Sequence, residues 1–101
     1  MIDMCVAEKM TFEDLVDWYV RQLVLYGDAE NAEIIRNAFA CGEPTVALDM
    51  AVIRSKQLNI IPERHIIKRS CELLDPDDDG MEICKRFLTS NDLPRMREDN
   101  C

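Results

Sequence analysis

The chain has 101 residues, of which 48% are hydrophobic, and 20 acidic against 12 basic side chains give it a net charge of −8. This length and apolar share suit one folded domain whose core needs neither disulfides nor metal, and they exclude a disordered chain. The negative charge argues against direct binding of nucleic acid, whose phosphates it would repel. A basic protein partner fits the charge, and so does solubility alone.

The cysteines are five, an odd number, and no CxxC pair occurs, which indicates free thiols in a reducing compartment. Cys41, Cys71 and Cys84 each stand among apolar residues at helical spacing, where we expect buried thiols. The sequence MIDMCVAEKM has neither the basic segment nor the apolar run of a signal peptide. No stretch reaches the ~20 apolar residues of a membrane span. We therefore predict a cytoplasmic protein.

The first helix is predicted to follow a short lead-in over residues 1–9. Thr11 begins it with a capping box in which Asp14 takes the place of the usual glutamate. Met10 and Leu15 are spaced for the hydrophobic contact that often accompanies this cap. The helix should end at Gly27. Its apolar face comprises Phe12, Leu15, Val16, Tyr19, Leu23 and Tyr26, widened by Trp18, Val20 and Val24.

The second helix is predicted to begin at Asp28, which is a good N-cap residue. It should end at Gly42, where we expect the positive φ of a left-handed helix cap. Its core stripe comprises Ala32, Ile35, Ala38 and Phe39, with Ile34 alongside.

The third helix, from about residue 45 to 57, is predicted to be the central one. Pro44 suits the first turn of a helix. Asp49, Arg54 and Lys56 are expected to be exposed. A helix that is apolar over most of its circumference is usually covered by other helices. The apolar residues that meet this description are Val46, Ala47, Leu48, Met50, Ala51, Val52 and Ile53.

The remaining chain predicts two more helices. One follows Pro62, and the other runs from Met81 to Thr89, before a loose polar tail over residues 91–101. No alternating strand pattern occurs. We therefore predict an all-α fold, a single compact bundle of about five helices with mostly antiparallel neighbours. The apolar residues of the last two helices are Ile66, Ile67, Cys71, Leu73 and Leu74, then Ile83, Cys84, Phe87 and Leu88.

The segment 75–80 matches the first half of an EF-hand loop, with aspartates at loop positions one, three and five and glycine at six. Position twelve of such a loop needs a bidentate glutamate, and Arg86 stands there. We interpret the segment as a turn in which Asp78 or Asp79 caps the fifth helix. A degenerate calcium-binding domain is the less favoured alternative, and we predict no metal and no other cofactor.

Enzymatic motifs are missing from the sequence. His65 is the only histidine, and no nucleophile or orienting acid accompanies it in a recognisable motif. The chain has no GxSxG, no GxGxxG and no phosphate-binding loop. We predict that the protein is not an enzyme.

Acidic side chains are the main candidates for a function. Most have a local explanation as helix caps, but together they can steer a basic protein onto the surface. Trp18 and Tyr19 are adjacent on one helix, so we expect one of them in the core. The other is either part of a wide buried face, which is the favoured interpretation, or half exposed as an interface anchor. The predicted partner-binding residues are Asp14, Asp17, Trp18, Glu30, Glu33, Glu43, Asp49, Asp77, Asp78 and Asp79.

One turn carries a resemblance to a known family. Gly42-Glu43, followed after three residues by Ala47-Leu48-Asp49, resembles the GE…AL(E/D) segment of small helical immunity proteins of bacterial polymorphic toxin systems. The contact-dependent growth inhibition systems belong to this class. In the family a long helix precedes the segment and an apolar link follows it, as residues 23–26 and 58–62 do here. The resemblance covers about residues 11–75, so the acidic loop and the last helix lie outside it.

The resemblance implies a cytoplasmic protein that binds and neutralises the toxin domain of a sibling cell's effector, which is often a basic nuclease. Acidic side chains of the inhibitor would then stand where nucleic-acid phosphates bind. The alternative is a helical adaptor or regulatory module that binds another protein and has no toxin partner.

Overall fold

The computed structural model describes residues 10–89 and contains five α-helices in that range. No strand occurs among the described residues, so the all-α prediction is confirmed. The predicted lead-in and tail lie outside the described residues, as do Cys5 and Cys101. The helices are α1 (Phe12–Leu25), α2 (Ala29–Ala40), α3 (Pro44–Gln57), α4 (Arg64–Leu73) and α5 (Asp79–Thr89).

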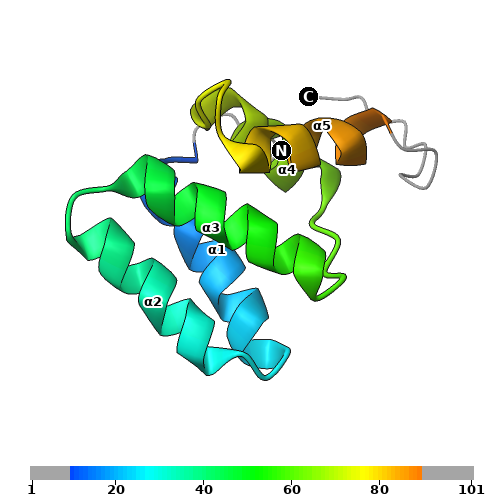
Figure 1. Cartoon of the computed structure of the whole chain (residues 1–101). Coiled ribbons are helices and arrows are strands. Elements are labelled where there is room, and N and C mark those ends of the chain that lie inside the picture. Colours follow the sequence, from blue (N-terminus) through cyan, green and yellow to red (C-terminus); the bar gives the residue numbers. More distant parts are fainter. Residues whose placement is uncertain (1–9, 90–101) are drawn as a thin grey trace, which may run out of the picture.

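The helices form two groups (Figure 1). In the first group, α1, α2 and α3 each contact the other two, and consecutive helices run antiparallel. The second group is the pair α4 and α5, which lie side by side above the first group in Figure 1. Because α5 packs on α3 and α4 touches α1, this pair closes the core on its upper side.

The N-terminus of α1 has the predicted capping box. The Thr11 hydroxyl accepts the Asp14 N–H at 3.2 Å, and the Asp14 carboxylate accepts the Thr11 N–H at 3.0 Å. Met10 packs against the core to which Leu15 belongs. These contacts satisfy backbone donors that a helix start leaves free, so they set where α1 begins.

The turns after α2 and α3 rest on residues in the left-handed region. Gly42 has φ +85°, which confirms the prediction, and Asn59 has φ +62°. At the end of α2, the Gly42 N–H donates to the Phe39 carbonyl at 3.0 Å, and the Glu43 N–H donates to the Ala38 carbonyl at 3.2 Å. This pair of bonds is a Schellman cap, which turns the chain sharply toward the next helix.

The core contains one buried hydrogen-bond chain that joins α1 to α4. The Tyr19 hydroxyl lies 2.8 Å from the Ser70 hydroxyl, which donates its own proton to the Ile66 carbonyl at 2.8 Å. Tyr19 must therefore be the donor to Ser70. Burial raises the pKa of Tyr19 far above its ordinary value, so the phenol keeps its proton.

The third helix is less enclosed than predicted. Val46 is 46% exposed, and Met50 and Ile53 are only partly buried. α3 is the central helix, as predicted, because it packs on α1, α2 and α5. Its cover does not extend to Val46, so the expectation that all its apolar residues are buried was wrong. Its buried residues are Ala47, Leu48, Ala51, Val52 and Ser55.

The cysteines divide into three environments. Cys84 is buried, as predicted, and Cys71 is partly buried. Cys41 is exposed, contrary to prediction, because it occupies the C-cap position of α2, where the chain leaves the helix for the turn. No helix within residues 10–89 has the length and apolar character needed to cross a membrane.

Candidate functional site

Three of the predicted acids come together where α5 begins against α3. The Gly80 N–H donates to the Asp49 carboxylate at 2.5 Å, so an acid of α3 caps the start of α5. Burial raises the pKa of Asp49, and the charges of Asp78 and Asp79 act in the same direction, while the Gly80 hydrogen bond opposes them. Asp49 is partly buried, which corrects the expectation of exposure. Its carboxylate holds two helices together.

The segment before α5 is a turn and lacks the geometry of a calcium loop. Gly80 is buried in the first turn of α5 and does not have a positive φ, unlike the glycine that makes the sharp turn of an EF-hand loop. The Asp78 carboxylate accepts the Asp75 N–H at 3.0 Å and is not bonded to α5, so the predicted capping by Asp78 is corrected to capping by Asp49. Among the described residues, no group of three or more acids, cysteines or histidines could hold a metal ion.

The predicted residues of α1 have contacts inside the fold. Asp14 belongs to the capping box, and Asp17 forms an ion pair with Arg36 of α2 at 3.4 Å. Trp18 is partly buried and meets Tyr19 edge to face, with ring centroids 5.1 Å apart. Tyr19 is the core residue of the pair, as predicted for one of the two, and Trp18 is half-buried.

Asp28 links the start of α2 to α3. Its carboxylate accepts bonds from Asn31 and lies 2.5 Å from Nε of Arg54. These two hydrogen bonds, that of Arg54 first, hold the pKa of Asp28 below its usual value. Arg54 is partly buried, although the sequence predicted it to be exposed. Arg54 is therefore already paired with an acid inside the fold.

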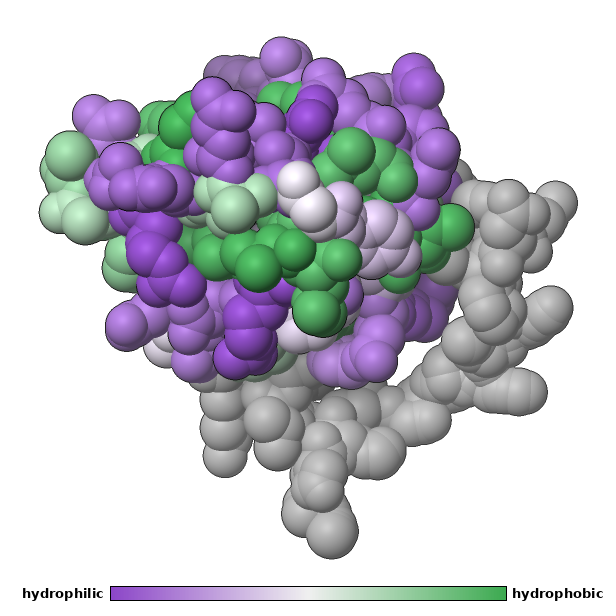
Figure 2. Space-filling model, turned by 90° about the horizontal axis from the view of Figure 1, so that it is seen from below, coloured by the Kyte–Doolittle hydropathy of each residue, from purple (hydrophilic) through white to green (hydrophobic). Residues whose placement is uncertain are grey.

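The C-terminal end of α1 exposes a run of apolar side chains that we call the apolar tip. It consists of Val24, Leu25 and Tyr26, which are 51%, 76% and 58% exposed. The predicted apolar face of the first helix included Val24 and Tyr26, and this was wrong. The buried part of α1 ends at Leu23, because the cap at Gly27 turns the chain away immediately afterwards. Figure 2 views the side of the molecule on which this turn lies, and hydrophobic groups there form a band bordered by hydrophilic ones.

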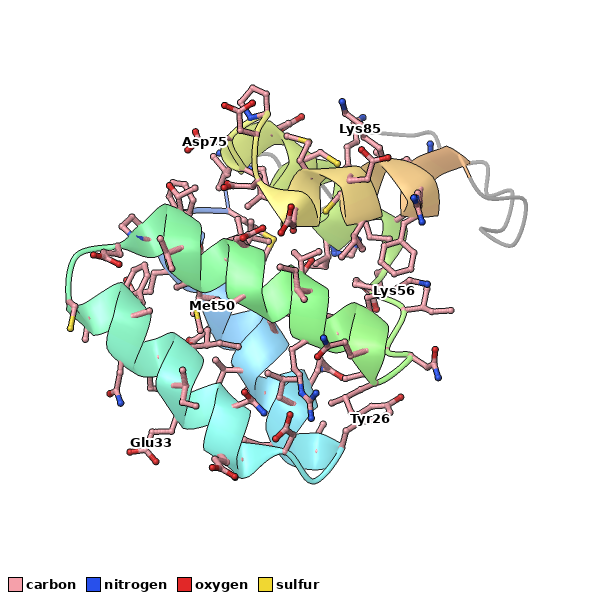
Figure 3. All side chains as sticks on the ribbon, viewed as in Figure 1. Tyr26, Glu33, Met50, Lys56, Asp75 and Lys85 are labelled. Atoms are coloured by element: carbon pink, nitrogen blue, oxygen red, sulfur yellow. The ribbon has the colours of Figure 1, made fainter. Side chains whose placement is uncertain are left out.

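Two predicted acids lie on the helix that follows the apolar tip. Glu30 and Glu33 are exposed on the first turns of α2, directly after the turn at Gly27. Neither has a hydrogen-bond or ion-pair partner within residues 10–89. Figure 3 shows Glu33 at the lower left of the molecule and Tyr26 at its lower right. The α1–α2 region therefore carries both exposed apolar side chains and unpaired carboxylates.

The other predicted acids lie elsewhere. Glu43 is exposed at the N-cap of α3 without a side-chain capping bond, at the far end of α2 from the apolar tip. Asp77 is exposed just before α5, and Figure 3 shows the neighbouring Asp75 at the opposite end of the molecule from Tyr26. The predicted acids thus do not form one face.

Sequence reasoning missed Leu25 and the exposure of its two neighbours. The available signal was the run Val24-Leu25-Tyr26 itself, since three consecutive apolar residues cannot all turn toward one face of a helix. Comparison with protein-family models, with curated proteins and with solved structures gave no match.

Proposed function

We propose that this protein is an immunity protein that binds a basic toxin domain, a nuclease, and blocks its active site. The observation that carries the proposal is the exposed apolar tip, with the unpaired carboxylates of Glu30 and Glu33 on the helix that follows it. Three adjacent apolar side chains, each more than half exposed, are unfavourable in water and become favourable once a partner buries them. The resemblance of the segment 42–49 to immunity proteins adds the class of partner.

The chemistry of this surface suits a partner with a small apolar pocket surrounded by lysine and arginine. Tyr26 supplies an aromatic anchor of the kind that dominates binding energy in protein interfaces. Glu30 and Glu33 need break no internal ion pair before they meet a cation of the partner. In a nuclease, such cations bind the phosphates of the substrate, so carboxylates placed there would exclude nucleic acid.

The direct test is co-production of this chain with the product of the neighbouring gene. We expect that product to be toxic alone, and we expect this chain to restore growth and to purify with it as a complex. A complex that forms without any toxicity to suppress would favour the adaptor alternative. Absence of both rescue and complex would overturn the proposal.

The surface itself is tested by matched substitutions, with the dissociation constant as readout. Tyr26→Ala and Glu33→Lys should each weaken binding at least tenfold, about 1.4 kcal/mol. Val46→Ala, an exposed apolar residue of α3, and Asp77→Lys, near the opposite end, serve as controls. They should change the constant less than about twofold. If Asp77→Lys weakens binding and the tip substitutions do not, the partner binds the α5 end instead.

A further inference from the structure

The α2–α3 pair carries apolar side chains that reach the surface of the molecule. On α3, Val46, Met50 and Ile53 follow each other at intervals of four and three residues, so they lie on one face of the helix. On α2, Ile34 and Ala38 share a face for the same reason. Val46 and Ile34 are each 46% exposed, and the other three residues are partly buried. Each helix therefore has an apolar stripe at the surface.

Two contacts fix the orientation of the stripe on α3. Arg54 lies 2.5 Å from Asp28 at the start of α2, so the side of α3 that carries Arg54 faces α2. The Asp49 carboxylate accepts the Gly80 N–H, so the side that carries Asp49 faces α5. Successive helical residues are about 100° apart, which places the stripe between these two sides and opposite the buried residues of α3. Figure 3 accordingly shows Met50, one turn before Arg54, at the boundary of α3 with α2.

The stripe on α2 lies on the same side of the helix pair. Arg36 forms an ion pair with Asp17 of α1 at 3.4 Å, so the side of α2 that carries Arg36 faces α1. Ile34 and Ala38 are two residues before and after Arg36, which puts them roughly 160° away from it around the helix. They therefore lie on the side of α2 that is turned away from α1.

The antiparallel course of the two helices brings the stripes together. Ala38 and Ile34 stand four and eight residues before Gly42, and Val46 and Met50 stand four and eight residues after it. Antiparallel helices that are joined by a tight turn place side by side the residues that are equally distant from the turn. The two stripes thus form one surface, which we call the apolar seam and which consists of Ile34, Ala38, Val46, Met50 and Ile53.

Acidic side chains border the apolar seam. Glu43 is exposed at the turn between the helices, and Glu30 is exposed on α2 one turn before Ile34. Neither carboxylate has a hydrogen-bond or ion-pair partner within residues 10–89. The exposed base Lys56 lies in the last turn of α3, beyond Ile53 (Figure 3). An apolar strip with acids at its edges is complementary to a helix whose apolar face is flanked by lysine or arginine.

We propose that the apolar seam binds a basic amphipathic helix of a partner protein. The helix lies along the side of α3 that α1, α2 and α5 leave open. Its apolar side chains, spaced three and four residues apart, cover Ile34 and Val46, and its basic side chains pair with Glu30 and Glu43. A second copy of this chain is the poorer occupant, because a symmetric contact would bring the acids of both copies into one interface. The seam shares no apolar residue with the apolar tip, so this inference goes beyond the proposed inhibition of a toxin.

The test measures binding of the full chain to a synthetic helix. The probe is an alanine-rich peptide of about 16 residues that carries leucines along one face and lysines on either side of them. A matched peptide carries glutamates in place of the lysines. Calorimetry should show saturable binding of the lysine peptide below about 1 mM and at least tenfold weaker binding of the glutamate peptide. Absence of saturable binding, or equal binding of the two peptides, would overturn the proposal.

Neutral substitutions locate the peptide without changing the net charge. Ile34→Ser and Val46→Ser each remove an exposed apolar group and should weaken binding of the lysine peptide about fivefold or more. Leu25→Ser, in the apolar tip, is the matched control, because Leu25 is 76% exposed and lies outside the seam. It should change the dissociation constant less than about twofold. If Leu25→Ser weakens binding and the two seam substitutions do not, the peptide occupies the tip and the proposal fails.

Two further measurements test the sign of the charge and the choice of occupant. Glu43→Gln removes a charge but no capping bond, since Glu43 makes none, and it should weaken binding of the lysine peptide about twofold at low salt. An unchanged constant would exclude a basic partner at this edge. Sedimentation of the free chain should show a monomer, and a dimer that Val46→Ser dissociates would assign the seam to a second copy instead. None of these measurements involves a toxin, so they stand or fall apart from the proposed function.

Discussion

The buried hydrogen bond between Tyr19 and Ser70 makes a quantitative prediction about stability. Ser70→Ala removes the acceptor and leaves the Tyr19 hydroxyl inside the core without a partner. Tyr19→Phe removes the donor instead, and Ser70 still donates to the Ile66 carbonyl. The two substitutions delete the same bond, but only the first leaves a buried polar group unpaired.

The expected magnitudes follow from this asymmetry. Tyr19→Phe should lower the free energy of unfolding by about 1 kcal/mol, the net value of a typical hydrogen bond. Ser70→Ala should lower it by about 2–3 kcal/mol, because the desolvation of the Tyr19 hydroxyl is no longer compensated. The double variant should cost no more than Ser70→Ala alone, since neither polar partner remains. The coupling energy between the two sites should therefore be about 1 kcal/mol or more.

Thermal and urea unfolding followed by circular dichroism measure this cycle. For a domain of this size, 1 kcal/mol corresponds to a Tm change of roughly 4–8 °C, so each step is resolved. Equal losses for the two single variants, with a double variant at their sum, would refute the reasoning. That result would mean that each hydroxyl contributes to the free energy of unfolding independently of the other.

Three further predictions concern the helix starts and ends. Gly80→Ala should destabilise the fold by about 1–2 kcal/mol, because the new Cβ would lie 2.6 Å from the Asp49 carboxylate oxygen that caps α5. Thermal unfolding measures this loss, and an unchanged Tm would contradict the contact. Gly42→Ala meets no atom within 4 Å, so its loss of about 1 kcal/mol should come from the positive φ alone. Stability should fall as the pH drops below 3.8, the ordinary pKa of Asp28, because the folded state holds this carboxylate ionised beside Arg54 and the unfolded state binds the proton more readily. Asp28→Asn keeps a capping side chain and should weaken this acid dependence of the Tm, and an identical pH profile would exclude Asp28 as its source.

The sequence by itself determined the five helices and most of their ends. The capping box at Thr11 and the left-handed residue at Gly42 act within a single helical turn, so a short stretch of chain contains both the donor and the acceptor. The unequal burial of Trp18 and Tyr19 was also predictable, because adjacent helical residues point in different directions.

Only the tertiary structure decided which contacts the polar residues make. The acceptor of the Gly80 N–H is Asp49, 31 positions away, and the partner of Asp28 is Arg54, 26 positions away. The sequence around Asp28 explains it as a helix cap, and the sequence around Asp49 explains it as an exposed residue. Neither stretch indicates which helix carries the group that each carboxylate binds. Such pairings depend on how whole helices pack.

The candidate surface depends on packing in the same way. Periodicity indicates which residues share one face of a helix, but it does not indicate where the neighbouring helix stops covering that face. Coverage of α1 ends at Leu23, so Leu25 and Tyr26 are exposed, while Asp75, before α5, lies at the opposite end of the molecule from Tyr26. The sequence determined the amount of negative charge, and the arrangement of the helices decided where each acid lies relative to the exposed apolar side chains.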